Sequence, residues 1–223
     1  MSALEICFCC PAGDHHLSFA YRFLQTYLNF PPMIEHELII LTDPGNEAQA
    51  EEIFAVCNRV KVVPTPDFAK DLSRYETWVK QSTAECVMML GGSTYCRRPG
   101  WGLRAFTAFQ QMGRNNLYGA CGHTGAGPVR PHLRSTGFWG SPSMLARYPG
   151  WPRNEIGRYT AEHGSGCMSD WFASQGATCW VINFGSQYPL SNANDDPQGY
   201  ARGSQQVLLI GDRLTMSPYQ PFP

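Results

Sequence analysis

The sequence lacks the features of several protein classes. No run of apolar residues approaches the roughly 20 that a membrane-spanning helix needs. The formal net charge is −1, so no broad basic field is available for nucleic acid or an anionic membrane surface. Residues 1–10 contain Glu5 and no basic residue, unlike the start of a secretory signal peptide. We therefore predict a cytoplasmic protein with no membrane span and no nucleic-acid partner.

The nine cysteines are odd in number, scattered, and mostly placed inside apolar runs. This pattern favours reduced thiols in a core over a disulfide framework. Cys7, Cys9 and Cys10, with His15 and His16 close by, raise the alternative of a zinc site. Strand alternation would place Cys7 and Cys9 on one face and Cys10 on the other. We therefore predict buried thiols and no metal site at these residues.

Apolar runs alternate with helical patterns along the first hundred residues, which predicts βαβ units and a mainly parallel sheet. Strands are expected at 4–10, 37–42, 59–63 and 85–90, and helices at 14–28, 47–57, 67–82 and 101–111. The later part is less regular: strands are expected at 116–121, 133–140 and 177–184, helices from Ser141-Pro142 and at 166–175, and loops at 122–131 and 149–164. Residues 206–210 fit either a helix or a strand. No repeat or linker divides the 223 residues, so one domain is predicted.

The fourth predicted strand ends abruptly in Gly91-Gly92-Ser93-Thr94, and Arg97-Arg98 follows. In open α/β sheets, ligands bind beyond the carboxyl ends of the strands. Glycine lets the backbone approach a ligand closely, and arginine binds phosphate through its planar fork. We therefore predict the functional site at this loop, with a small anionic ligand.

The order of these segments resembles a glycosyltransferase of the GT-A fold, most closely the family 2-like enzymes. The segments that carry the resemblance are ELIILTD (37–43), MMLGGS (88–93), RPGW (98–101), LYGACG (117–122), PHLRST (131–136) and EHGSG (162–166). They cover nearly the whole chain, and their order and spacing matter more than any single motif. The resemblance implies an α/β, single-domain GT-A-like (nucleotide-diphospho-sugar transferase) fold, with a mainly parallel central sheet flanked by helices. It further implies a nucleotide-binding half, 1–100, and an acceptor-side half, 101–223.

In that family the first half binds a nucleotide-sugar donor, which places Cys10, Pro11, Ala12 and Asp43 near the base and ribose. Asp43 also fits the simpler reading that Asp43-Pro44-Gly45 is turn chemistry.

The loop after the fourth strand usually carries an Asp-x-Asp motif, which holds a divalent cation on the diphosphate. Here Gly91, Gly92, Ser93 and Thr94 occupy that place without a carboxylate. Mn²⁺ and Mg²⁺ prefer oxygen ligands, above all charged ones, so the resemblance implies at most weak use of either cation.

Arginines are the obvious substitutes for the missing carboxylates and their cation. The candidates are Arg97, Arg98 and Arg134, and Arg98 or Arg134 is expected to offset the charge of the leaving diphosphate.

An inverting transferase needs a carboxylate to take the proton of the acceptor hydroxyl. By resemblance this base lies near Glu162 and His163, with Asp170 as the second choice after Glu162. The acceptor would be a glycan or another hydroxyl compound. The competing explanation for these acids is stabilisation by a helix N-terminus.

Aromatic side chains are frequent in the second half and could stack on an acceptor sugar. Trp151, in a Pro-Gly-Trp-Pro segment, is the expected groove residue, whereas Trp171 and Trp180 are expected in the core.

Two alternatives remain open. A non-catalytic GT-A-like module that binds a nucleotide or a glycan would explain the missing Asp-x-Asp. A thiol-dependent α/β hydrolase would use Cys96, Cys121 or Cys167 with His123 or His163, although no third orienting group lies at a recognisable spacing.

Overall fold

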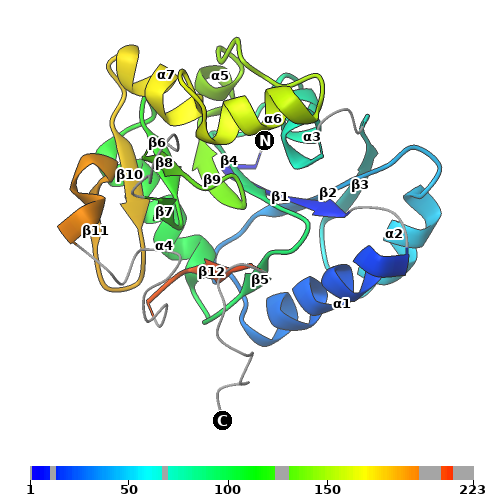
Figure 1. The fold of residues 1–223 in the computed structure, drawn as a ribbon. Helices are drawn as coiled ribbons and strands as arrows, with labels where there is room; N and C mark the ends of the chain where they lie inside the picture. Colours follow the sequence, from blue (N-terminus) through cyan, green and yellow to red (C-terminus); the bar gives the residue numbers. More distant parts are fainter. Residues whose placement is uncertain (1, 11–13, 67–69, 124–130, 196–206, 213–223) are drawn as a thin grey trace.

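An eight-stranded sheet lies at the centre of the computed structural model, which describes residues 2–10, 14–66, 70–123, 131–195 and 207–212 (Figure 1). The strand order is β11-β10-β6-β9-β4-β1-β2-β3. These strands are β1 (Leu4–Cys10), β2 (Glu37–Thr42), β3 (Val60–Pro64), β4 (Cys86–Leu90), β6 (Leu117–Gly119), β9 (Gly137–Gly140), β10 (Cys179–Ile182) and β11 (Gln187–Pro189). Strands β3, β2, β1 and β4 are parallel neighbours, as are β6 and β10. Strand β9 pairs antiparallel with both β4 and β6, and β11 pairs antiparallel with β10. The predicted α/β class with a mainly parallel sheet is confirmed.

Helices cover both faces of the sheet. They are α1 (Asp14–Asn29), α2 (Glu47–Phe54), α3 (Asp71–Val79), α4 (Trp101–Met112), α5 (Pro142–Leu145), α6 (Glu155–His163) and α7 (Met168–Ser174). Helices α1, α2 and α4 pack on one face with Phe8 and Cys10, and α3, α5, α6 and α7 pack on the other with Cys7 and Cys9. The predicted alternation of these three cysteines is therefore confirmed. Among the described residues, no helix combines the length and apolarity that crossing a bilayer requires.

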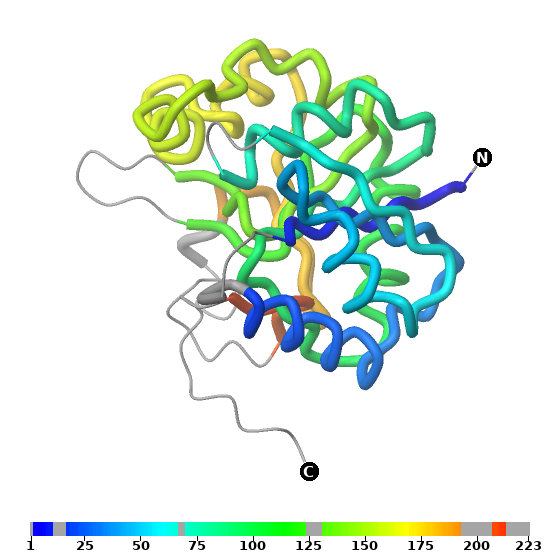
Figure 2. Tube along the Cα trace, turned by 90° about the vertical axis from the view of Figure 1, so that its right-hand side faces the viewer, coloured from blue at the N-terminus to red at the C-terminus, as the bar shows by residue number. Residues whose placement is uncertain are grey.

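Three shorter features complete the structure. Strand β5 (Tyr95–Cys96) pairs with β12 (Ile210–Gly211), and β7 (Gly122–His123) pairs with β8 (His132–Leu133). A 3₁₀ helix, η1 (Leu190–Asp195), follows β11. In Figures 1 and 2, α6 and α7 (yellow) lie above the sheet and β12 (red) lies below it. Of residues 206–210, which the sequence leaves open between helix and strand, Ile210 is in a strand and pairs with Cys96, residues 207–209 are in neither, and residue 206 lies outside the described part of the chain.

Strands β1, β2 and β4 lie where the sequence predicts them. Both β1 and β4 are buried at every position, so they read as continuous apolar runs, as parallel strands covered on both faces do. The short helix after Ser141 is also confirmed, since the Ser141 hydroxyl accepts from the Met144 N–H at 3.3 Å.

Three predictions about local structure are wrong. The expected loop 122–131 begins with β7, and residues 124–130 lie outside the described part of the chain. The expected loop 149–164 contains α6, which Asn154 caps by accepting from the Gly157 N–H at 2.8 Å. The expected strand 133–140 is divided into β8 and β9 by a turn at Arg134–Gly137, and this turn contributes to the site.

Candidate functional site

The carboxyl ends of β1, β2 and β4 meet at one edge of the sheet. Cys10 pairs with Thr42, and Leu90 pairs with Phe8 on one side and with Gly137 on the other. Because β9 runs antiparallel to β4, the segment before β9 lies beside the loop after β4. Residues 91–94 and 134–136 are therefore neighbours in space although they are distant in the chain.

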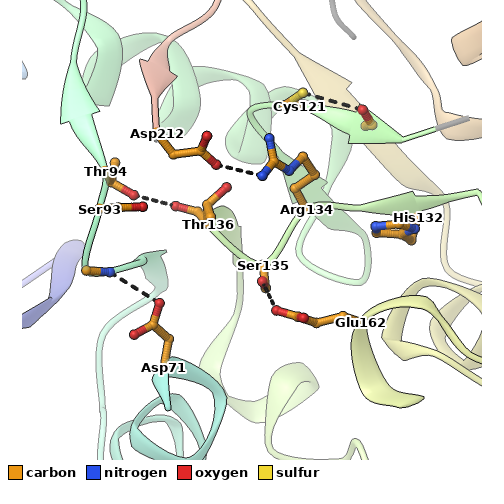
Figure 3. Close-up of polar contacts among 12 residues, drawn as sticks. Asp71, Ser93, Thr94, Cys121, His132, Arg134, Ser135, Thr136, Glu162 and Asp212 are labelled. Carbon is orange, nitrogen blue, oxygen red and sulfur yellow. Dashed lines mark hydrogen bonds and ion pairs between the residues drawn. The ribbon is translucent and has the colours of Figure 1, made fainter. Parts of the chain in front are cut away.

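Thr136 ties these two segments together. Its carbonyl oxygen accepts from the Gly91 N–H at 3.1 Å and from the Thr94 hydroxyl at 2.8 Å (Figure 3). Thr94 is fully buried, so its hydroxyl shapes the loop, whereas Ser93 is half-buried. The Ser93 carbonyl in turn accepts from Arg22 Nη2 at 2.7 Å, which fixes the loop against α1.

A carboxylate that the sequence analysis missed lies against this loop. Asp71, the first residue of α3, accepts from the Gly92 N–H through Oδ2 at 3.2 Å (Figure 3). A Cβ atom added to Gly91 would lie 2.7 Å from Asp71 Oδ2 and 3.3 Å from Thr136 Cα. Residue 91 must therefore be glycine for the carboxylate to approach. The available signal was topological, since a helix that follows a parallel strand begins at the carboxyl edge.

The Asp43 side chain is held by an ion pair in addition to its place in a turn. Its Oδ1 forms an ion pair with Nη2 of Arg74, whose side chain is 1% exposed while that of Asp43 is 23% exposed. Burial raises the pKa of the adjacent Cys10 thiol to about 11, with Arg74 opposing that rise and Asp43 adding to it. Cys10 and Asp43 thus lie together, with one carboxylate partly open to solvent. Pro11 and Ala12 lie outside the described residues, as do the side chains of His15 and His16.

Arg134 forms a buried ion pair at the opposite side of the loop. Its Nη2 lies 2.8 Å from Oδ2 of Asp212, and the two side chains are 11% and 3% exposed (Figure 3). Asp212 directly follows β12, and the pairing of Gly211 with Tyr95 brings it here from the far end of the described chain. A small cavity beside the pair, lined by Cys121 and Thr136 among others, has room for about one water molecule.

Glu162 points toward the same edge from α6. Its Oε1 accepts from the Ser135 hydroxyl (Figure 3), and its Oε2 lies 2.6 Å from Arg158 Nη1. Glu162 is in the last turn of α6, where the helix dipole disfavours an acid, so helix capping does not explain it. Asp170 lies in the first turn of α7, where the dipole does favour an acid. The structure therefore separates the two carboxylates that the sequence analysis treated together.

His163 lies between Glu162 and a second histidine, His132. Its Nε2 lies 3.4 Å from Glu162 Oε2, and its Nδ1 lies 3.1 Å from Nε2 of His132. Burial lowers the pKa of His163; Glu162 opposes this shift, and Arg158 and Arg134 reinforce it.

Other predicted residues lie apart from this group. Arg98 is exposed, with its guanidinium 5.7 Å from the centre of the Phe184 ring. The expectation for Trp151 is wrong, because its ring is buried against Tyr148 at 5.6 Å. The half-exposed aromatic residue next to the site is Tyr159, one turn before His163 on α6.

Among the described residues, the charged side chains at this edge do not form a hard-cation site. In the described part of the chain, no three or more His, Cys, Asp or Glu side chains are arranged to share one metal ion. Asp71 is bonded to the Gly92 amide, and Asp212 is paired with Arg134. Weak use of Mn²⁺ or Mg²⁺ therefore stays a prediction.

The cysteines proposed as nucleophiles are buried. Cys96, Cys121 and Cys167 are at most 6% exposed. Burial raises the pKa of the Cys96 thiol, and it raises that of Cys121 to about 12. Reactive thiols are accessible and have lowered pKa values, so the structure does not favour a thiol-dependent hydrolase.

The sequence matches no known family model and no curated protein sequence. Among solved structures, the chain is similar to a mannosyltransferase from Pyrobaculum calidifontis in complex with GDP-Man and Mn²⁺, with a TM-score of 0.56 and 12% identity over 80% of this chain and 54% of that one. It is also similar to a 4-diphosphocytidyl-2C-methyl-D-erythritol synthase from Anaerococcus prevotii, with a TM-score of 0.49 and 9% identity over 65% and 74% of the two chains. This chain thus spans about half the length of the mannosyltransferase, 54%. The similarity to the mannosyltransferase shows the fold, because the two chains share an α/β architecture.

Proposed function

We propose that the protein is a glycosyltransferase, which moves a sugar from a nucleotide-sugar donor to a hydroxyl group of an acceptor. One observation carries this proposal. The carboxyl edge of the sheet gathers the Gly91–Gly92 loop, the buried Arg134 and the carboxylate of Glu162 around a single connection, 134–136. The neighbour in complex with GDP-Man has the same kind of fold, which supports this class of donor.

The donor would lie across the first half, 1–100. The partly open carboxylate of Asp43 is suited to accept hydrogen bonds from a ribose hydroxyl or a base N–H, and Arg74 holds it in place. The diphosphate would lie beside the Gly91–Gly92 loop at the carboxyl edge, where Asp71 already occupies the space left by the absent Cβ of Gly91. Arg134 would offset the charge that develops on the leaving diphosphate, because a guanidinium binds phosphate oxygens in pairs.

The acceptor would lie against the second half, 101–223. Glu162 would take the proton of the acceptor hydroxyl, while Ser135 and Arg158 orient its carboxylate. Arg134 and Ser135 are consecutive. One short segment would therefore position both the arginine that stabilises the leaving group and the serine that orients the base, Glu162. Tyr159 is 50% exposed and offers a ring for an acceptor sugar.

A second candidate function is nucleotide binding without transfer. Two observations favour it: the loop after β4 has no Asp-x-Asp, and the Glu162 carboxylate is already paired with Arg158.

The first experiment is a thermal-shift panel of UDP, GDP, CMP, dTDP and their sugars, each with and without Mn²⁺. A ligand at 100 times its Kd stabilises a protein by about 2.7 kcal/mol. For a chain of this size that raises the midpoint by roughly 5–10 °C. We expect such a shift with one nucleotide and its sugar. No shift with any nucleotide would contradict both candidate functions.

The second experiment compares Glu162→Gln with Glu155→Gln. Both glutamates lie on α6 and both pair with Arg158. Glu162 is 11% exposed and also contacts Ser135 and His163, whereas Glu155 is 56% exposed and also pairs with Lys70. We expect Glu162→Gln to bind the nucleotide but to lose turnover, and Glu155→Gln to keep both. Full turnover by Glu162→Gln would remove the assignment of the base. Binding without turnover by the wild-type protein, across all donors, would support the second candidate.

A further inference from the structure

A row of imidazoles leads from Glu162 into the protein, and the transfer reaction proposed above does not by itself require it. His163 Nε2 lies 3.4 Å from Glu162 Oε2, and His163 Nδ1 lies 3.1 Å from His132 Nε2. His132 stacks in turn on His123 of β7, with ring centres 5.1 Å apart and an interplanar angle of 11°. His132 is visible at the right of the site in Figure 3. Three of the six histidines of the chain are thus in mutual contact beside the site.

The two ring nitrogens that face each other restrict the protonation of the pair. In a hydrogen bond between neutral imidazoles, one nitrogen carries the proton and the other accepts it. The negative charge of Glu162 favours a proton on His163 Nε2, which faces it. His163 Nδ1 is then the acceptor, and His132 Nε2 must be the donor. His132 is 3% exposed, so water does not compete well for this role.

Burial shifts the His163 ring toward its neutral form, and the charges around it act in both directions. Glu162, Arg158 and Tyr159 face it from α6, Arg134 from the segment before β9, and His132 from β8. Burial is the main factor that lowers the pKa of His163; Glu162 opposes this shift, and the two arginines reinforce it. Near neutral pH the ring is therefore neutral, with one proton to donate.

We propose that His132 and His163 are positioning residues for Glu162: His132 donates to His163 Nδ1, which fixes the Nε2–H tautomer and directs that N–H at the Glu162 carboxylate, 3.4 Å away. This contact aims the Glu162 carboxylate at the acceptor hydroxyl. A proton added to His163 Nδ1 would break its bond to His132, because two donors would then face each other. This inference rests on the proposed function only in the role given to Glu162.

The hydrogen-bond order can be tested without a substrate. Long-range ¹H–¹⁵N NMR of the full chain distinguishes the tautomers of histidine rings. At pH 7.5 we expect a proton on Nε2 of both His163 and His132. A proton on Nδ1 of His163 would overturn the proposal, whatever the activity of the protein.

The effect on the reaction is tested with pairs of variants at one position. His132→Gln can place an amide N–H where His132 Nε2–H lies, whereas His132→Leu has similar bulk and no donor. With GDP-mannose and UDP-glucose as probes, we expect His132→Leu to lose turnover by about 10- to 100-fold, as when the second partner of an oriented histidine is removed. We expect His132→Gln to keep most of it.

The pH profile separates positioning from a purely structural role. Turnover by the wild-type protein should fall as the pH drops below about 6.5, where a histidine with a lowered pKa begins to take its second proton. This fall is the acid limb of the pH profile. His132→Leu should change the pH at which it occurs. His36→Gln should not, because His36 forms hydrogen bonds with Tyr27 and Ile34 away from the site. Equal losses in His132→Gln and His132→Leu, with an unmoved acid limb, would overturn the proposal. If Glu162→Gln is inactive while both His132 variants are fully active, the proposed base stands and this inference fails. If neither probe is turned over by the wild-type protein, the proposed function is in doubt and the NMR result still decides this one.

Discussion

Replacing Asp212 with asparagine removes one charge from a buried pair and leaves its shape. Asp212 is 3% exposed and Arg134 is 11% exposed, with 2.8 Å between the paired atoms. The guanidinium would remain buried without its carboxylate. Breaking a buried ion pair by removing one partner costs about 3–5 kcal/mol, because an uncompensated charge stays in a poorly hydrated place.

The magnitude can be compared with a matched exposed pair. Glu35 and Arg59 are also linked by a short ion pair, but their side chains are 76% and 59% exposed. Exposed pairs contribute about 0–1 kcal/mol, so Glu35→Gln should change the free energy of unfolding very little. For a chain of this size, about 3–5 kcal/mol lowers the melting midpoint by roughly 6–20 °C.

The assay is urea unfolding of the wild-type protein, Asp212→Asn and Glu35→Gln, followed by the fluorescence of the six tryptophans. An unchanged slope with a lowered midpoint for Asp212→Asn would show lost stability of one cooperative fold. If Asp212→Asn lowers the free energy of unfolding no more than Glu35→Gln does, then β12 does not hold Asp212 against Arg134 in solution. That result would refute the burial argument for this side of the site.

Three further predictions test other parts of the structure. Gly91→Ala forces a Cβ to 2.7 Å from Asp71 Oδ2 and should cost about 1–3 kcal/mol in urea unfolding, whereas Gly185→Ala meets its nearest atom at 3.5 Å and should cost less; equal costs would contradict the close approach. Burial lowers the pKa of His36, so the unfolded chain takes up its proton first and stability falls as the pH drops below about 6.5; His36→Gln should reduce the fall in Tm between pH 7.5 and 5.5, and an unchanged fall would contradict this. Cys57 alone among the nine cysteines is not buried, and its raised pKa predicts slow alkylation by iodoacetamide that Cys57→Ser abolishes; fast labelling at another cysteine would restore the thiol-enzyme alternative.

Buried parallel strands were the most predictable part of the fold. β1 and β2 have the predicted bounds, because strands covered on both faces are uninterrupted apolar runs. Their carboxyl ends then locate Asp43 and the Gly91–Gly92 loop at one edge of the sheet.

Helix α6 could not be predicted from apolar periodicity. Only Ala161 of its nine residues is buried, so no apolar stripe marks it, and Ile156 is 81% exposed. The one local signal was Asn154 before Glu155, a cap followed by an acid in the first turn. Trp151 shows the opposite problem, since its ring packs in the core and against Tyr148, although its Pro-Gly context placed it at the surface.

The two missed carboxylates reach the site through topology. Asp71 arrives because α3 begins at the carboxyl edge, and Asp212 arrives because β12 pairs with β5. Neither belongs to a motif with a recognisable spacing to Gly91 or Arg134, so no reading of the local sequence could have placed them there.

The charge balance of the edge constrains how a donor can bind. Arg74, Arg134 and Arg158 each have a carboxylate partner, namely Asp43, Asp212 and Glu162. A diphosphate would therefore meet arginines whose charges are already offset, and long-range attraction would add little to its binding. Its affinity must then come from close hydrogen bonds to these fixed groups or from a divalent cation that accompanies it. The nucleotide panel with and without Mn²⁺ separates these two sources. A shift that does not depend on Mn²⁺ assigns the affinity to the arginines, and a shift that appears only with Mn²⁺ assigns it to a cation bound largely by the phosphates themselves.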